Sequence, residues 1–495
     1  MKLKIKEIIK NVYISKWFIL FIVLCGAFIR IRQYIFNRSL WLDEAKLALN
    51  IMRYNYLDLL KPLDYIQTAP PLFLFIVNFL TEKFSYHEYV LRFLPLMAGI
   101  ASLFLFWYLA NKFLNKFIVP IAVGLLSFSS YAIYYSNEFK QYSVDLMITI
   151  VILILSVYVY KKNFDLKSNL LLGILGVLFI CLSHTSVFIL AGASLSLVLT
   201  VFLKERLRGI KKFGYILGMS LFWIISFAVN YLFIIRVIAP AQIEQEYWQS
   251  SYAPMPIISV SDLLWYPKTL LYILRNPLDL YFVGITLLVL FAGLVSFYNK
   301  KEKIFLFLVS LPFIFLIIAS MLGAYPIIDR LVVFILPIFF LLISKGIEEF
   351  SLNLSGKNII IIFLLIILIF FQPLAQSSKS LLAPRYKEET RPMIEYYQNN
   401  KAKEDKIYVY YSTVPAFLYY TRETKEGFIE GVRSREDQEK YSDELESLDG
   451  EGRIWFIFSH VHENEEEIYI KKLNELGKKL DYKSAYGSSI YLYDI

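Results

Sequence analysis

The chain alternates long runs of hydrophobic residues with short basic segments over its first 375 residues. Runs such as residues 17–29 and 359–371 contain no charged residue. A helix of about 20 such residues spans a hydrocarbon core about 30 Å thick. The pattern predicts a polytopic membrane protein with eleven transmembrane helices. They are expected at about residues 17–36, 90–111, 116–135, 141–160, 169–183, 185–203, 212–237, 279–298, 304–322, 327–345 and 358–374.

One further apolar segment, residues 72–80, is too short to cross the membrane. Pro70 and Pro71 precede it, and proline is tolerated at the first turn of a helix. We interpret the segment as a helix that lies in the membrane interface. Every predicted internal turn is then basic, for example the turn with Lys161 and Lys162, as the positive-inside rule requires. The expected topology places the N-terminus in the cytoplasm and the C-terminus outside.

The pattern changes at about residue 376, where hydrophobic runs shorten and charged residues become frequent. Period-two and helical patterns follow each other in this last part, as in a domain that mixes strands and helices. It lacks a glycine-rich phosphate loop, so no nucleotide site is predicted. Strands are expected at 406–411, 453–459 and 488–493, and helices at 433–448 and 463–476.

Two domains are therefore expected. The transmembrane domain covers residues 1–375 and includes a first outer loop at 37–89 and a long outer loop at 239–279. Residues 376–495 form a soluble extracytoplasmic α/β domain of ordinary size.

Composition agrees with this division. Of the 495 residues, 57% are hydrophobic and the mean hydropathy is +0.52, which excludes a soluble multidomain protein. The net charge of +9 does not indicate nucleic-acid binding, because residues 1–375 carry a net +14 and residues 376–495 a net −5. Cys25 and Cys181 lie inside apolar runs, so no disulfide framework is predicted.

Two adjacent carboxylates, Asp43 and Glu44, follow the first predicted transmembrane helix in the segment RSLWLDEAKLALN. Charged groups at the edge of hydrocarbon are costly, which makes them functional candidates. A carboxylate placed there can act as a general base that takes a proton from a hydroxyl. Two other interpretations stay open: solvated loop charges, and acids that complement the dipole at the N-terminus of a helix.

Further polar and aromatic residues gather at the predicted outer ends of the helices. Lysine and arginine can stabilise a departing phosphate, and aromatic rings can stack on sugar faces. Structural alternatives stay open: Glu138 can pair with Lys140, His184 can be an ordinary interfacial histidine, and Arg330 can anchor its helix by snorkelling. The outer candidates are Glu138, Lys140, Tyr142, His184, Trp248 and Arg330.

Five short segments occur in the order WLDEA, TAPPLF, YVLRFLPLMAG, YYSNEFKQYS and YPIIDRLVVFILPIFFLL. In this order they resemble bacterial members of glycosyltransferase family 39, relatives of protein O-mannosyltransferases and of the lipid A aminoarabinose transferase. The resemblance extends over the whole chain, and order and spacing carry it, since each motif is short. It implies the GT-C fold with a C-terminal extracytoplasmic α/β domain.

The resemblance also implies roles for single residues. Asp43 matches the catalytic carboxylate of the family, with Glu44 as its usual neighbour, and Glu138 matches a second outer-loop acid. Lys140 stands where many relatives have arginine, which keeps the charge but loses the bidentate phosphate geometry. Arg330 matches the arginine at the start of a late helix and is a candidate for the donor phosphate.

Two positions depart from the family pattern. Leu331 replaces the tyrosine that follows the late arginine in many relatives. Ala69 precedes Pro70 and Pro71 where the family often has histidine. Contacts that those two side chains make in relatives are therefore not expected here.

Together these residues predict an integral-membrane glycosyltransferase that moves a sugar from a polyprenyl-phosphate donor to an acceptor hydroxyl outside the membrane. Asp43 is expected to act as general base, with inversion at the anomeric carbon. Lys140 and Arg330 are expected to hold the departing phosphate. Glu44 and Glu138 are expected to orient the acceptor or to help hold a divalent metal.

Tyr142, His184 and Trp248 are predicted to bind substrate. No resident cofactor is predicted with certainty, and the acceptor is a hydroxyl of a lipid, a glycan or a protein. The expected location is the plasma membrane, with several crossings. The alternative function is a flippase or transporter of lipid-linked sugars, although such proteins usually carry midplane charges and inverted repeats, which this sequence lacks.

Overall fold

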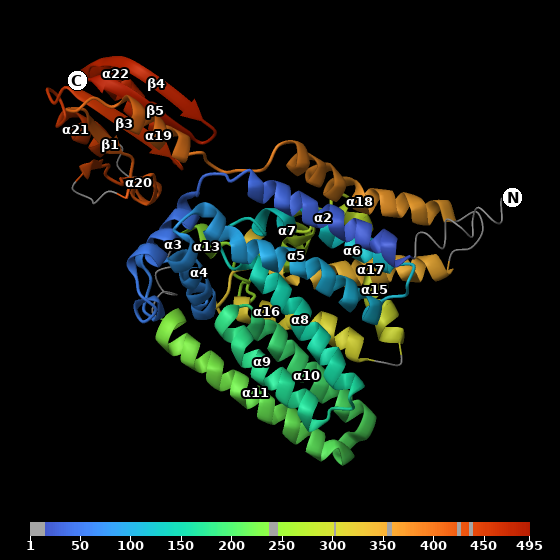
Figure 1. The fold of residues 1–495 in the computed structure, drawn as a ribbon. Helices are drawn as coiled ribbons and strands as arrows, with labels where there is room; N and C mark the ends of the chain where they lie inside the picture. The colour runs from blue at the N-terminus through green and yellow to red at the C-terminus, as the bar shows by residue number, and fades with distance from the viewer. Residues whose placement is uncertain (1–14, 237–245, 301–302, 354–358, 423–426, 435–438) are drawn as a thin grey trace.

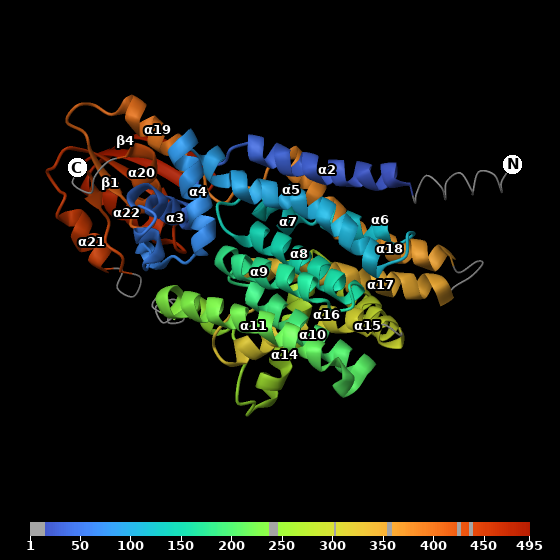
Figure 2. The same cartoon turned by 60° about the horizontal axis from the view of Figure 1, so that its bottom comes forward.

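The computed structural model describes residues 15–236, 246–300, 303–353, 359–422, 427–434 and 439–495. In these ranges the chain forms a helical domain followed by a small domain built on a β-sheet (Figure 1). Helices α2 (Lys16–Ile35) and α11 (Ile210–Asn230) lie on opposite sides of the helical domain (Figures 1 and 2). The sheet domain lies at one end of the helices.

Eight helical segments within the described ranges are long and apolar enough to cross a membrane. Each coincides with a predicted span, which confirms a multi-pass membrane protein. They are α2, α5 (Glu88–Phe113), α8 (Tyr142–Lys161), α10 (Ser186–Glu205), α11 with the π-helical segment Tyr231–Ile235, α16 (Ile304–Met321), α17 (Leu336–Asn353) with the preceding 3₁₀ segment η5 (Asp329–Ile335), and α18 (Ile359–Leu382).

The other three predicted spans coincide with shorter apolar helices, α6 (Val119–Phe128), α9 (Leu166–Leu182) and α15 (Val283–Asn299). α6 ends early because Ser129 is extended and its hydroxyl caps the next helix, α7 (Ser130–Tyr135). α9 and α15 have 17 residues each, the lower end of the range for a crossing. The total of eleven spans stays a prediction, as does the side of the membrane on which each terminus lies.

The predicted outer loops are largely helical. The first contains α3 (Leu42–Arg53) and α4 (Pro71–Phe84), and the second contains α13 (Glu246–Gln249) and α14 (Val260–Arg275). α4 begins at a proline, has 14 residues and is not among the candidate spans of the described chain, in agreement with the predicted interfacial helix. Residues 239–245 of the second loop lie outside the described residues.

The sheet domain has five strands in the order β2–β1–β3–β5–β4. β1 (Lys406–Val409), β3 (Arg453–Ser459) and β5 (Ser488–Asp494) confirm the three predicted strands. β1 pairs in parallel with β2 (Ile429–Glu430) and β3, whereas β5 runs antiparallel to β3 and to β4 (Lys478–Ala485). The two strands that the sequence did not predict are the edge strands of the sheet.

Both faces of this sheet are covered. Trp455 and Ile457 of β3 pack on the side of α19 (Arg391–Asn400) and α20 (Val414–Thr421). Phe456 and Phe458 pack on the other side, towards α21 (Glu439–Glu446) and α22 (Glu465–Leu476). The predicted helix at 463–476 is confirmed. The one predicted at 433–448 is shorter, since Arg433 and Ser434 are not helical and residues 435–438 lie outside the described ranges.

The boundary between the domains lies later than the predicted residue 376, because α18 continues to Leu382. The linker that follows touches the first outer loop before it reaches α19. The Glu388 carboxylate accepts a 2.6 Å hydrogen bond from the backbone N–H of Leu42, at the start of α3. α3 and α4 lie beside the sheet domain in Figure 2. The linker therefore helps to fix the helix that carries Asp43.

Candidate functional site

A cavity of about 530 Å³ opens between the first outer loop and helices α8, α10, α11 and α16. One end is polar and collects charged side chains from distant parts of the chain. The rest of its wall is largely apolar and comes from α10, α11 and α16, with side chains such as Phe188, Phe227 and Phe315. Six of the eight predicted site residues line it: Asp43, Lys140, Tyr142, His184, Trp248 and Arg330.

An ion pair between Asp43 and Arg330 marks the polar end. Asp43 Oδ2 lies 3.0 Å from Arg330 Nη2, and the two side chains are 21% and 20% exposed. Arg330 also lies over the rings of Trp41 and Trp248, with its guanidinium carbon 5.4 and 5.6 Å from their centroids. Arg330 is therefore not a simple snorkelling anchor, because it points into the cavity and pairs with the carboxylate.

Asp43 stays ionised in this surrounding. Burial opposes its charge, but the positive charges of Arg330 and Lys140 outweigh that effect and hold the pKa of Asp43 below its ordinary value. Asp43 also lies in the first turn of α3, where the helix dipole favours a carboxylate. Asp43 is therefore a helix N-terminal acid, as one of the open interpretations stated. It also lines the cavity, so it is accessible to a bound substrate.

Lys140 is a buried cation beside this pair. Its ammonium group donates to Gln67 Oε1 over 2.5 Å, and the residue is only 5% exposed. Burial lowers the pKa of Lys140 to about 8, and the charge of Arg330 acts in the same direction, while Asp43 opposes both. At neutral pH Arg330 and Lys140 thus place two cations beside the Asp43 carboxylate, an arrangement that attracts an anion such as a phosphate.

Glu44 points away from the cavity into a dry cluster. It is fully buried and accepts from Arg92 Nε and Nη2 over 2.9 and 2.6 Å, and from the Phe139 backbone N–H over 2.6 Å. Arg92 also donates to the backbone oxygens of Arg38 and Ser39. The predicted contact of Glu44 with the acceptor is therefore corrected, since the side chain ties α3 to α5 and to the segment before α8.

Glu138 is also buried and does not line the cavity. Its Oε2 lies 3.5 Å from Lys387 Nζ and 3.8 Å from Arg38 Nη2. The alternative of a Glu138–Lys140 ion pair is wrong, because the cations within ion-pair distance of Glu138 in the described chain are these two. Direct contact of Glu138 with an acceptor is likewise corrected, since Glu138 lies outside the cavity lining and beside these two cations.

The three predicted substrate-binding residues face the cavity from three elements. Tyr142 opens α8 and packs edge-on against Tyr135, with ring centroids 5.1 Å apart. Trp248, on α13, lies beside Arg330. His184 lies between α9 and α10, and burial lowers its pKa to about 4, so it is neutral at physiological pH. Its Nε2 is buried with no hydrogen-bond partner among the described residues, which does not fit a satisfied interfacial histidine.

The sequence did not reveal Gln67 and Lys387 as site residues. Gln67 precedes Ala69 by two positions, so the TAPPLF segment was the available signal for it. Lys387 lies in the linker after α18, where its ammonium group sits 3.2 Å from the centroid of the Trp41 ring. No pattern in the linker indicates this contact.

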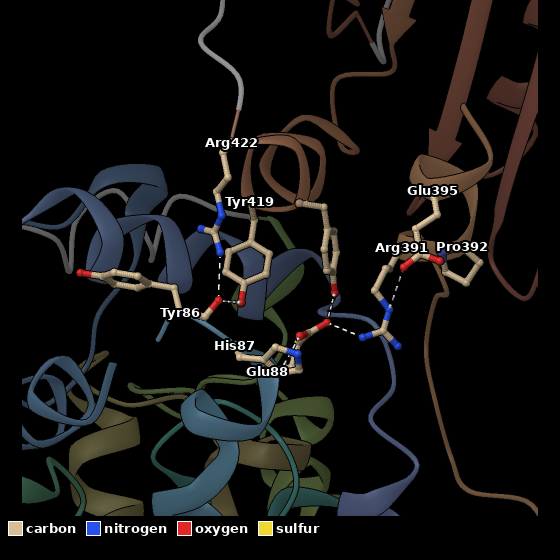
Figure 3. Close-up of a pocket in the computed structure, with 9 residues that line it drawn as sticks. Tyr86, His87, Glu88, Arg391, Pro392, Glu395, Tyr419 and Arg422 are labelled. Atoms are coloured by element: carbon tan, nitrogen blue, oxygen red, sulfur yellow. Dashed lines mark hydrogen bonds and ion pairs between the residues drawn. The ribbon is translucent and has the colours of Figure 1, made fainter. Parts of the chain in front are cut away.

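A second, shallower groove of about 460 Å³ lies between the two domains (Figure 3). Glu88 Oε1 accepts from Arg391 Nη1 over 2.7 Å and from the Tyr420 hydroxyl over 3.1 Å. Tyr419 and Arg422 both donate to the backbone oxygen of Tyr86. These paired groups dock the sheet domain onto the helices, so the groove is a domain contact rather than the reactive site.

The charges of the main cavity do not fit a divalent metal. Asp43 is already paired with Arg330, and Lys140 adds a second positive charge. No group of three or more histidine, cysteine, aspartate or glutamate side chains suited to a metal occurs in the described ranges. No step of the chemistry below is therefore assigned to a metal.

Several solved structures share this arrangement of helices and sheet. ArnT from Cupriavidus metallidurans matches with 9% sequence identity and a TM-score of 0.57, over 95% of this chain and 97% of ArnT. A structure of the same ArnT bound to undecaprenyl phosphate matches with 11% identity and a TM-score of 0.54, over 95% and 98%. The apo oligosaccharyltransferase of Archaeoglobus fulgidus matches with 11% identity and a TM-score of 0.50, over 90% and 70%.

The chain has the GT-C fold. This confirms the fold that the motif order implied. The match with ArnT covers 95% of this chain and therefore includes most of its C-terminal sheet domain. No protein-family model matches the sequence, and no curated protein matches it significantly. Identities of 9% and 11% establish the GT-C fold alone, so the activity has to be argued from the cavity.

Proposed function

We propose that this protein is a membrane glycosyltransferase that takes its sugar from a polyprenyl-phosphate donor. The observation that carries the proposal is the Asp43–Arg330 ion pair at the polar end of a largely apolar cavity. Such transfer needs a general base, a group that binds the leaving phosphate, and a surface for hydrocarbon. ArnT with bound undecaprenyl phosphate, which shares the fold, supports the same conclusion.

We assign the donor phosphate to Arg330 and Lys140. Both cations line the cavity, and the guanidinium group offers a planar fork of N–H donors that matches phosphate oxygens. The polyprenyl chain is assigned to the apolar wall of α10, α11 and α16, where Phe188 and Phe315 lie. A hydrocarbon chain buried there is stabilised by the hydrophobic effect.

Asp43 acts as the general base on the acceptor hydroxyl. In the free protein Arg330 neutralises this carboxylate. When the donor phosphate occupies the N–H groups of Arg330, Asp43 loses its main counter-charge, so its pKa rises towards the ordinary value and it becomes a stronger base. Arg330 thus couples donor binding to the activation of Asp43.

The reaction is a single displacement. Asp43 takes the hydroxyl proton while the acceptor oxygen bonds to the anomeric carbon and the bond from that carbon to the phosphate oxygen breaks. The polyprenyl phosphate leaves with the electron pair, stabilised by Arg330 and Lys140. Attack opposite the leaving group inverts the anomeric centre.

The reaction takes place on the extracytoplasmic side, a location that rests on the basic internal turns of the sequence. The acceptor is a hydroxyl of a lipid, a glycan or a protein. The hydrogen bond from Leu42 to Glu388 supports a role for the linker after α18 in holding Asp43 at the cavity.

The direct test is the Asp43→Asn variant of the full chain in lipid nanodiscs, assayed for release of polyprenyl phosphate from labelled donor extract. We expect turnover to fall by about a hundredfold to ten-thousandfold, the usual contribution of a general base, while donor binding persists. Asp64→Asn is the matched control, because Asp64 lies in the same outer loop, pairs with Arg53 and does not line the cavity.

Undiminished turnover in Asp43→Asn would remove the proposed mechanism. The same assay distinguishes glycosyl transfer from the alternative function, transport of the lipid-linked sugar. A flippase moves the labelled donor across the bilayer without releasing polyprenyl phosphate, so donor movement without release would replace glycosyl transfer by transport.

A further inference from the structure

Three residues that line the cavity each carry a buried polar atom without a hydrogen-bond partner in the described part of the chain. The three atoms are Gln141 Oε1, Asp145 Oδ1 and His184 Nε2. They come from two places: Gln141 and Asp145 from the start of α8, and His184 from the connection between α9 and α10. Polar groups this deep are normally paired, so an unpaired set on one cavity indicates that a ligand supplies the missing partners.

Asp145 is the most demanding member of this set. It is 4% exposed, Ser183 lies within hydrogen-bond distance, and Asp145 Oδ1 has no partner among the described residues. Its place in the first turn of α8 fits a helix N-terminal acid, but that does not explain the unpaired atoms of Gln141 and His184. A polyprenyl chain cannot pair them either, because hydrocarbon has no hydrogen-bond donor. The occupant of this part of the cavity must therefore carry donor groups.

The distance of these three residues from Lys140 indicates the size of the ligand. Gln141 directly follows Lys140, and Asp145 lies one helical turn deeper, about 6 Å along the axis of α8. That step is roughly the size of one sugar ring. Phe188 and Tyr325 line the same cavity with rings 5.2 Å apart, and such apolar surfaces suit the C–H faces of a sugar.

We propose that Gln141, Asp145 and His184 form the subsite that binds the hydroxyl groups of the donor sugar and determines which sugar is accepted. The ligand class is a sugar whose hydroxyl groups can donate to these atoms, attached to a polyprenyl phosphate. The inference rests on the proposed function and adds its specificity site. His184 contributes a neutral ring, and Asp145 contributes a carboxyl oxygen that a sugar hydroxyl can pair.

The test measures binding to the full chain in nanodiscs. The probes are bare undecaprenyl phosphate and undecaprenyl phosphates that carry glucose, galactose, mannose or N-acetylglucosamine. Asp145→Leu keeps the branched shape of the side chain and removes the acceptor. Asp145→Asn, which also keeps the size, is used if the leucine variant does not fold. Thr149→Val is the matched control, since Thr149 is buried one turn further along α8 and does not line the cavity.

We expect the wild type to bind one of the glycosylated lipids at least tenfold more tightly than the bare lipid. Asp145→Leu should lose that preference and bind all probes alike, Asp145→Asn should lose part of it, and Thr149→Val should keep it. Affinity for bare undecaprenyl phosphate should stay within about twofold in every variant, because its phosphate depends on Arg330 and Lys140. A preference of about tenfold is the size expected of one hydrogen bond between a protein group and a sugar hydroxyl.

Two results overturn the inference and leave the proposed function standing: a wild-type ranking that persists in both Asp145 variants, or equal binding of bare and glycosylated lipids by the wild type. A persisting ranking means that other residues distinguish the sugars. Equal binding of bare and glycosylated lipids means that water alone fills the subsite. A wild type that binds none of the lipids overturns the proposed function together with the inference.

Discussion

Asp43 and Glu44 are neighbours in sequence but belong to two different regions, and the contrast between these regions explains the site. Glu44 lies in a dry cluster where Arg92 and a backbone N–H satisfy its carboxylate. Asp43 lies on a cavity, is 21% exposed and shares one ion pair with Arg330. The same chemical group thus builds the scaffold at one position and stays available for chemistry at the next.

The difference arises from helix geometry. Successive side chains of an α-helix point about 100° apart, so two adjacent acids in the first turn of α3 cannot face the same partner. The buried face of α3 turns Glu44 towards α5, which leaves Asp43 directed at the cavity. The two arginines follow the same division, Arg92 in the scaffold and Arg330 at the cavity.

The largest expected difference between Glu44 and Asp43 is in their contribution to the free energy of unfolding. Glu44→Gln should lower the free energy of unfolding by about 3 kcal/mol, because it leaves Arg92 as a buried charge without its counter-ion. Asp43→Asn should change it by less than about 1 kcal/mol, since that pair is partly exposed. Thermal unfolding of both variants in the same detergent gives the comparison.

The stability that Glu44 contributes depends on pH. Burial raises the pKa of Glu44, but Arg92 and Arg38 lower it further, so the net pKa lies below its ordinary value. The stability that this pair contributes is present above the unfolded-state pKa and is lost as pH falls through the folded-state value. Equal destabilisation by Glu44→Gln and Asp43→Asn would contradict the division into scaffold and cavity.

A smaller effect is expected on the pH dependence of donor binding. The pKa of Lys140 is about 8, so its positive charge is present at pH 7 and largely lost at pH 9. If the charged form alone binds phosphate, affinity for undecaprenyl phosphate should fall about tenfold between these two values. Titration of binding in nanodiscs at fixed ionic strength measures this fall.

Lys140→Arg provides the control, because arginine keeps its charge over this range. The fall in affinity should disappear in that variant. A slope that persists would assign the titration to another group, of which Lys387 is the nearest candidate, since burial lowers its pKa as well.

Much of the fold was predictable because it follows from hydrophobic patterning. Eight long helices and three shorter ones coincide with the predicted spans, and the strands with a buried run, such as β3, were found. β4 was missed because it is an edge strand with mostly exposed residues, KKLDYKSA, and carries no clear alternation. A hydrophobic pattern arises from buried side chains, so an element with mostly exposed side chains is difficult to predict from it.

The sequence predicted the residues that line the cavity, but it did not predict the roles of the residues that hold them in place. The motifs indicated Asp43, Lys140 and Arg330, which the structure brings to one cavity. Glu44 was grouped with Asp43 because sequence adjacency does not show helix orientation. Lys387 was missed because its position depends on how the linker after α18 crosses to the first outer loop, a tertiary contact over more than three hundred residues.

The measurement that tests the central claim most directly is a cryo-EM structure of the full chain in nanodiscs with undecaprenyl phosphate. The account predicts the phosphate within hydrogen-bond distance of the Arg330 guanidinium and the Lys140 ammonium, with the hydrocarbon along α10, α11 and α16. Asp43 is then released from its ion pair. Phosphate bound instead in the groove between the domains, with the Asp43–Arg330 pair intact, would contradict the account.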